Sequence, residues 1–112
     1  MYEYKAKVIK VYDADTITVN MDLGFDVHIT KSIRLADIDA PEIRGKERPE
    51  GLKARDFLRT LILDKEVIVK TERDRTGKYG RYICNVFYEK DDLTIHINDL
   101  LVKEGYVTYK KY

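Results

Sequence analysis

The sequence predicts a mainly β domain of the α+β class: a five-stranded barrel with an inserted helix and a short C-terminal helix. Five segments alternate apolar and polar side chains with the period of two that is typical of half-buried strands. One segment, residues 50–64, changes to the spacing of an amphipathic helix. The alternation excludes an all-helical fold, and a doubly wound α/β fold would need a helix between most strands.

The first three predicted strands follow one another as a meander. Residues 4–12, 16–23 and 27–35 are rich in β-branched side chains and alternate. Gly24 provides the turn between the second and third strands. Pro41 ends the third strand, because proline has no N–H to give to a sheet.

The second half of the chain carries the helices and two more strands. Pro49 fits the entry to the long helix, and residues 66–72 and 81–89 are the fourth and fifth strands. Asn98 is the predicted N-cap of the short helix and Gly105 its C-cap. Three strands, a helix and two strands is the order of a Greek-key barrel of OB type. We expect residues 1–112 to form this single domain.

Composition limits the possible classes of protein. The chain has 112 residues, with 21 basic and 20 acidic side chains and a net charge of +1. Any binding of nucleic acid therefore depends on local clusters of charge rather than on the overall charge. Cys84 is the only cysteine, which excludes an internal disulfide, and the alternation places it in the core. With no signal-peptide pattern and no membrane-spanning apolar run, we expect an intracellular, cytoplasmic monomer without a membrane partner.

Two clusters of carboxylates are expected to meet. Asp13 and Asp15 open the second strand, whereas Asp39 and Glu42 follow the third. If these strands pair as a hairpin, the two clusters lie side by side and suit a hard cation, Ca²⁺ or Mg²⁺. Each cluster alone has a simpler interpretation as turn and loop carboxylates, and Asp37 is expected to face solvent.

Two arginines point to phosphate as the substrate group. Arg34 lies in the third strand, and Arg81 follows a glycine-containing loop that also holds Lys78 and Tyr79. A guanidinium matches phosphate through two parallel hydrogen bonds. Together with a cation and with Glu42 to take a proton from water, these side chains suit the hydrolysis of a phosphodiester.

The spacing of Arg34 and Asp39 raises a geometric problem. Residues five apart in a regular strand point to opposite faces. Both reach one site only if the strand bulges or turns near Ile38. The lone residues His28 and His96 are expected to have ordinary structural roles.

Five blocks of the sequence resemble the staphylococcal nuclease (thermonuclease-like) family. They read "VYDADT", "RLADIDAPE", the helix around "LKARDFLRTLI", "KYGR" and "LVKEG", and they occur in order across about residues 11 to 105. The family fold is an OB-type barrel with helices, in agreement with the pattern above. The resemblance implies a Ca²⁺-dependent nuclease that cuts DNA and RNA, preferentially single-stranded, and leaves 3′-phosphate ends.

The resemblance also implies a role for individual residues. Asp15 and Asp39 match direct calcium ligands, as does the backbone carbonyl of Ala40, and Asp13 matches an outer-sphere carboxylate. Glu42 matches the general base. The residues implied to bind phosphate or substrate are Arg34, Arg81, Lys78 and Tyr79. Tyr106, Tyr109 and Tyr112 are candidates to stack on bases, of which Tyr109 is assigned to substrate binding and Tyr106 to packing.

The chain departs from the family pattern in several ways. Ala14 stands where glycine is usual, the hairpin around Gly24 is longer than in the secreted prototype, and the prototype's C-terminal helix is absent. The near-zero net charge implies weaker nonspecific binding to nucleic acid. Two other classes remain: a noncatalytic barrel that binds single-stranded nucleic acid, and a module that reads modified peptides with an aromatic cage. The filled charged positions disfavour the first, and the scattered tyrosines disfavour the second.

Overall fold

The computed structural model describes residues 2–76 and 82–110. The elements are β1 (Glu3–Asp13), β2 (Thr16–Asp22), β3 (His28–Leu35), β4 (Ile38–Asp39), the 3-10 helix η1 (Gly45–Glu47), α1 (Arg48–Ile62), β5 (Glu66–Thr76), β6 (Tyr82–Lys90), β7 (Leu93–His96), α2 (Ile97–Lys103) and β8 (Thr108–Tyr109). None of the helices in these two ranges is long and apolar enough to cross a membrane.

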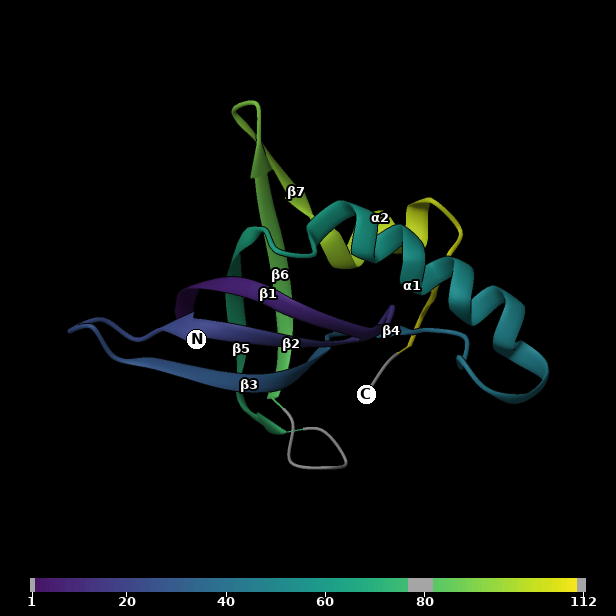
Figure 1. Ribbon diagram of the computed structural model, residues 1–112, viewed down its shortest axis with the longest axis horizontal. Helices are drawn as coiled ribbons and strands as arrows, with labels where there is room; N and C mark the ends of the chain where they lie inside the picture. The colour runs from purple at the N-terminus through teal and green to yellow at the C-terminus, as the bar shows by residue number, and fades with distance from the viewer. Residues whose placement is uncertain (1, 77–81, 111–112) are drawn as a thin grey trace.

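A closed barrel forms the centre of the fold (Figure 1). The main sheet has the order β3-β2-β1-β5-β6-β7, with antiparallel neighbours. A short parallel pairing between β3 and β6 joins Ile33–Leu35 to Tyr82–Cys84 and closes a barrel of β1, β2, β3, β5 and β6. The predicted α+β fold with an OB-type five-stranded barrel is therefore confirmed. Strand β7 pairs with β6 and lies outside the barrel.

The barrel interior is filled by the alternating apolar residues of the strands. Val8, Val11, Ile17 and Val19 are among the fully buried side chains of β1 and β2. Burying a side chain of this size contributes about 1.5–3 kcal/mol to folding. This burial fixes the register, because a slip by one residue would turn the apolar set outward.

Helix α1 packs against β1 through one apolar stripe. Ala54, Leu58 and Ile62, spaced by four, are fully buried on that stripe. The chain leaving the helix is then tied to the barrel, because Asp64 donates a backbone hydrogen bond of 2.8 Å to Val8. These contacts set the position of the helix and of the loop that precedes it.

The predicted third strand breaks before it reaches Asp39. Ala36 and Asp37 form a turn in which Asp37 has a φ of 62°, and the chain continues as the two-residue strand β4. This strand pairs with β8, with Ile38 opposite Tyr109 and Asp39 opposite Thr108. The turn provides the change of direction near Ile38 that the spacing of the site residues required.

The prediction that Asn98 caps the short helix is wrong. Helix α2 begins at Ile97, with His96 at the N-cap position, two residues earlier than predicted, and Asn98 is buried in its first turn. Its Oδ1 accepts a 3.0 Å hydrogen bond from the backbone of Val86, and its Nδ2 donates to the carbonyls of Ala36 (3.0 Å) and Cys84 (3.2 Å). Asn98 therefore joins α2, β6 and the turn before β4 inside the protein.

The other local predictions are closer to the structure. The predicted long helix starts and ends two residues earlier than expected, at Arg48 and Ile62. Gly105 ends α2 with a φ of 81°, as a C-terminal glycine does. Cys84 is fully buried, and burial raises the pKa of its thiol to about 12, in agreement with a structural role.

Candidate active site

The predicted acidic clusters meet in a hollow of about 470 Å³ at one end of the barrel. The turn between β1 and β2 forms one wall, and the end of β3, strand β4 and the loop after it form the rest. The predicted site residues that line it are Asp13, Asp15, Arg34, Asp39, Ala40 and Glu42. The sequence-based expectation that these residues lie together is consistent with this arrangement.

The turn between β1 and β2 holds Asp15 in place. The backbone N–H of Asp15 donates a 3.0 Å hydrogen bond to Oδ1 of Asp13, which is the ordinary local bond of an aspartate in a turn. Ala14 is fully buried between them. Thr16 Oγ1 donates a 3.0 Å hydrogen bond to Oδ1 of Asp15, whose side chain is only 10% exposed. The turn thus fixes a buried carboxylate at the bottom of the hollow.

Arg34 lies between two of the acids. Its Nη1 is 3.5 Å from Oδ2 of Asp15, and its Nη2 is 3.5 Å from Oδ1 of Asp39. Nη1 also donates a 3.2 Å hydrogen bond to the carbonyl of Ile38. The side chain of Arg34 is 13% exposed and that of Asp39 is 51% exposed, so the open side of the hollow is the side of Asp39. The turn before β4 therefore brings Arg34 and Asp39 to one site.

Glu42 stands at the rim of the same hollow. It is exposed and directly follows Pro41, which is half-buried. The ring of proline fixes its own φ, which restricts the path of the chain into Glu42. A carboxylate at the rim can contact solvent water and a group held in the hollow at the same time.

Burial changes the acidity of Asp13. Desolvation, and next the neighbouring carboxylate of Asp15, raise the pKa of Asp13 from 3.8 to about 7. Two adjacent carboxylates ionise together only at a cost in free energy, because like charges repel at short range. Hydrogen bonds from the backbone N–H groups of Asp15 and Thr16 lower the pKa in part.

The donor chemistry of the hollow suits a hard cation. Its carboxylates and the carbonyl of Ala40 are oxygen ligands, and the described lining residues include neither histidine nor cysteine. In residues 2–76 and 82–110, no three His, Cys, Asp or Glu side chains are grouped as a metal site. The prediction of a hard cation at this place therefore depends on the oxygen donors of the lining residues.

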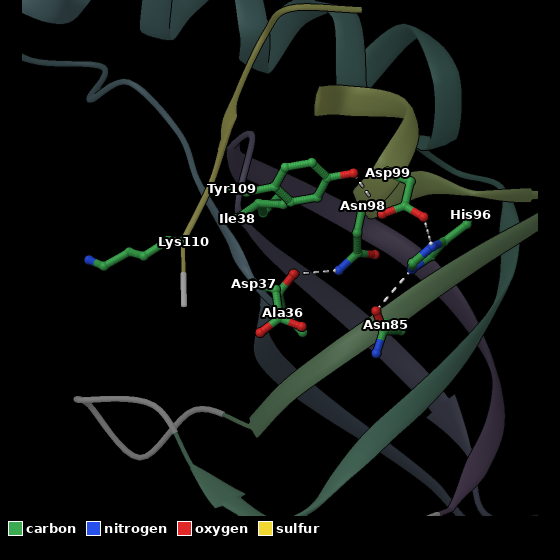
Figure 2. A pocket seen from close by; sticks show the side chains of 9 residues that line it. All are labelled: Ala36, Asp37, Ile38, Asn85, His96, Asn98, Asp99, Tyr109 and Lys110. Carbon is green, nitrogen blue, oxygen red and sulfur yellow. Dashed lines mark hydrogen bonds and ion pairs between the residues drawn. The ribbon is translucent and has the colours of Figure 1, made fainter. Parts of the chain in front are cut away.

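Four of the predicted site residues are not described in this hollow. Lys78, Tyr79 and Arg81 lie outside the described residues. Tyr109 lines a second hollow of about 530 Å³ (Figure 2). The residue is 65% exposed, and its hydroxyl donates a 3.4 Å hydrogen bond to Oδ1 of Asp99.

The second hollow also shows contacts that the sequence analysis missed. Nδ1 of His96 lies 2.8 Å from Oδ2 of Asp99, and Nε2 lies 2.9 Å from Oδ1 of Asn85 (Figure 2). The His96 ring stacks on Phe87 with 4.6 Å between ring centroids. These contacts agree with the predicted structural role of His96. Asp99 is only three residues along the chain, whereas Asn85 and Phe87 lie in β6 and had no local signal in the sequence.

Four further residues line the first hollow without having been predicted: Tyr12, Thr16, Ile43 and Arg44. Thr16 was visible only as the last letter of the "DADT" block, and its bond to Asp15 depends on the tight turn. Arg44 lies two residues after Glu42, and its side chain is exposed. Its basic side chain so close in sequence to the predicted general base could have indicated that Arg44 belongs to the site.

The resemblance of the sequence implied a barrel of this type with acids and an arginine at one site. Comparison with known proteins identifies the family. The family model described as "Staphylococcal nuclease homologue" matches residues 32–112. The chain belongs to this family.

Three curated relatives show how far the similarity extends. The thermonuclease of Staphylococcus hyicus is 29% identical over 98% of this chain and 62% of its own length. The micrococcal nuclease of Shigella flexneri is 33% identical over 98% of the chain and 60% of its own length. An uncharacterised protein of Methanocaldococcus jannaschii is 31% identical over 92% of the chain and 58% of its own length. The chain thus spans about three fifths of the length of these relatives.

Proposed function

We propose that the protein is a Ca²⁺-dependent nuclease that hydrolyses phosphodiester bonds in DNA and RNA with little sequence preference. The observation that supports this most is the hollow in which Arg34 bridges Asp15 and Asp39 while Glu42 stands at the rim. The names of the thermonuclease and the micrococcal nuclease among its relatives agree with the proposal. Single strands are the preferred substrate, because the bases of a single strand are free to stack on exposed aromatic rings.

The acids of the hollow form the cation site in this proposal. Asp15, Asp39 and the carbonyl of Ala40 are the direct ligands, and Asp13 acts through water. Bound Ca²⁺ supplies positive charge that stabilises the growing negative charge on the phosphoryl oxygens. Asp39 is half exposed, so the ion site is open toward solvent and substrate.

The remaining residues bind the phosphate and activate water. Arg34 donates hydrogen bonds to the scissile phosphate, and Arg81 does the same by family resemblance. Lys78 and Tyr79 bind a terminal phosphate on the same basis. Glu42 accepts a proton as a water oxygen bonds to phosphorus, the bond from phosphorus to the 5′ oxygen breaks, and this oxygen takes a proton from solvent. The products are a 3′-phosphate and a 5′-hydroxyl.

Cleavage of a single-stranded oligonucleotide with Ca²⁺ and with EDTA tests the proposal. The wild-type protein should cut only with Ca²⁺. Glu42→Gln keeps the size and hydrogen bonding of the side chain but removes the base, so the single-turnover rate should fall by about 10² to 10⁴. Glu104→Gln is the matched control, because Glu104 is an exposed carboxylate at the end of α2.

Binding measurements on the same preparations separate the possible outcomes. Calcium and nucleotide affinity should be nearly unchanged in Glu42→Gln, since Glu42 is not a proposed ligand of either. A rate that falls only in proportion to lost calcium binding would make Glu42 a ligand. Oligonucleotide binding without cleavage under either condition would favour the alternative, a noncatalytic module for single-stranded nucleic acid.

A further inference from the structure

Helix α1 touches the backbone of the active-site loop through a glycine. Gly51 is buried in the first turn of α1, against the peptide group that joins Glu42 to Ile43. A Cβ atom added at Gly51 would lie 2.5 Å from the carbonyl carbon of Glu42 and 2.9 Å from the nitrogen of Ile43, with the carbonyl oxygen closer still. Real Cβ atoms do not approach backbone atoms this closely, so any side chain at this position must displace the loop or the helix.

The other described glycines have a different function. Gly24, Gly45 and Gly105 have positive φ angles, and a Cβ atom added to any of them would meet nothing within 4 Å. These three glycines allow the backbone angles of turns, whereas Gly51 allows α1 to lie against the Glu42–Ile43 peptide. Glycine inside a helix costs about 0.5–1 kcal/mol relative to alanine. The helix therefore carries a poor helix former where it meets the backbone of Glu42.

The contact matters because, within residues 2–76 and 82–110, no hydrogen bond or ion pair holds the Glu42 side chain. That side chain is exposed, so the position of its carboxylate follows from its backbone rather than from packing. The backbone is fixed on one side by the 2.9 Å hydrogen bond from the N–H of Ala40 to Asp15. On the other side it is fixed by the surface of α1 at Gly51.

We propose that Gly51 is a positioning residue that sets the distance of Glu42 from the hollow. This inference rests on the proposed role of Glu42 as the general base. A side chain at Gly51 pushes the Glu42–Ile43 peptide away from the helix and moves the carboxylate with it. Because a misplacement of about 1 Å typically costs about a hundredfold in rate, Gly51→Ala should slow cleavage by roughly 30- to 100-fold.

A double-mutant cycle tests whether Gly51 acts through Glu42. The single-turnover rate is measured for the wild type, Gly51→Ala, Glu42→Gln and the double variant. In the Glu42→Gln background, Gly51→Ala should change the rate by less than about threefold, because the group it displaces is already inactive. If the two effects multiply, Gly51 acts through general packing and the proposal is overturned. Lys53→Ala, an exposed change to alanine in the same helix, should leave the rate unaltered.

The dependence on substrate concentration gives a second readout. Gly51→Ala should lower kcat and leave KM for the oligonucleotide within about threefold, because Arg34 and the floor of the hollow are untouched. A loss that falls mainly on KM would show that Gly51 supports substrate binding instead, and would overturn the proposal.

An NMR measurement keeps the inference separate from the proposed function. In ¹⁵N spectra without nucleic acid, Gly51→Ala should shift the amide signals of Glu42 and Ile43 far more than those of the barrel strands. Unmoved loop signals would overturn the inference even if the protein is a nuclease. If Glu42→Gln cleaves like the wild type, the proposed role of Glu42 fails, and this inference fails with it whatever the loop signals show.

If Gly51→Ala does not fold, a variant with a longer loop provides an alternative test. One glycine inserted after Gly45, which is exposed at the start of η1, gives the loop room to move outward. The combined variant should fold, yet cleave as slowly as expected for Gly51→Ala, because its Glu42 is no longer held. The insertion alone is its control. A combined variant that cleaves as fast as this control would overturn the proposal.

Discussion

The backbone N–H of Ala40 donates a 2.9 Å hydrogen bond to Oδ2 of Asp15. This bond joins the loop after β4 to the turn between β1 and β2, although the two residues are 25 positions apart. The same oxygen lies 3.5 Å from Nη1 of Arg34. Asp15 is therefore the point at which three separate segments meet, and substitutions there affect both the arrangement of the hollow and its charge.

The first prediction concerns the charge of Asp15. Asp15→Asn keeps one acceptor oxygen for the neighbouring donors, but it removes the negative charge that a hard cation requires. We expect calcium affinity to fall at least about tenfold, the scale seen when even an outer-shell partner of a metal ligand is lost. Isothermal titration calorimetry measures this, and Asp39→Asn should behave in the same way.

Asp37→Asn is the matched control for both variants. Asp37 is exposed in the turn directly before β4 and lines the second hollow rather than the first. Its replacement should leave calcium affinity as it is. Wild-type affinity in Asp15→Asn and Asp39→Asn would remove both residues from the proposed ligand set.

The second prediction concerns the shape of the Arg34 side chain. Its guanidinium contacts Asp15 and Asp39 through two different nitrogens, which a single ammonium group cannot do with the same geometry. Arg34→Lys should therefore lower the free energy of unfolding by about 1–3 kcal/mol, the cost of leaving a largely buried group without its partner. Urea unfolding gives the stability, and titration with a nucleotide phosphate should show weaker binding. A variant as stable and as tight-binding as the wild type would make Arg34 replaceable by any cation.

The third prediction concerns the buried amide of Asn98. Asn98→Ala leaves the N–H of Val86 and the carbonyls of Ala36 and Cys84 without this partner. The Cys84 carbonyl keeps the 2.7 Å hydrogen bond that it accepts from the N–H of Ala36, so two groups lose their hydrogen-bond partner. Since each buried polar group left unpaired costs about 1–3 kcal/mol, we expect a loss of at least about 2 kcal/mol in the free energy of unfolding. Asn20→Ala is the control, because Asn20 makes only an exposed 3.4 Å side-chain bond to Thr30. Equal stability of the two variants in urea unfolding would contradict the structural role of Asn98.

The barrel could be predicted from the sequence because its signals are local. Val8, Val11, Ile17 and Val19 alternate with polar residues, and this period identifies strands without any knowledge of their partners. The long helix was likewise predicted within two residues at each end. Whether a residue belongs to a strand or to a helix is indicated mainly by its neighbours in the chain, and these are visible in the sequence.

The pairing of β4 with β8 could not be predicted in this way. Each strand has only two residues, so neither shows a period, and their contact joins Asp39 to Thr108 across most of the chain. The turn at Asp37 depends on a positive φ that aspartate adopts less readily than glycine. The role of Asn98 was missed for the same reason, because its partners lie in distant segments. The two acidic clusters were expected to meet because a hairpin fixes which strand ends are neighbours.

The last prediction concerns the exposed ring of Tyr109. This residue pairs with Ile38 on β4, one position from Asp39, and its side chain lines the second hollow. If its ring stacks on a base, Tyr109→Ala should weaken binding of a single-stranded oligonucleotide by about 1–3 kcal/mol. Tyr109→Phe should bind almost as tightly, because it keeps the ring and loses only an exposed 3.4 Å hydrogen bond to Asp99.

Fluorescence anisotropy in the Glu42→Gln background measures this affinity without cleavage of the oligonucleotide. Tyr2→Ala is the matched control. Tyr2 is 71% exposed and precedes the first residue of β1, whereas Asp13 is the last residue of this strand. It should leave the affinity unchanged. Equal binding by Tyr109→Ala and the wild type would exclude stacking on this ring. An equal loss in Tyr109→Phe and Tyr109→Ala would instead assign the contribution to the hydroxyl, and so to its bond with Asp99 beside His96.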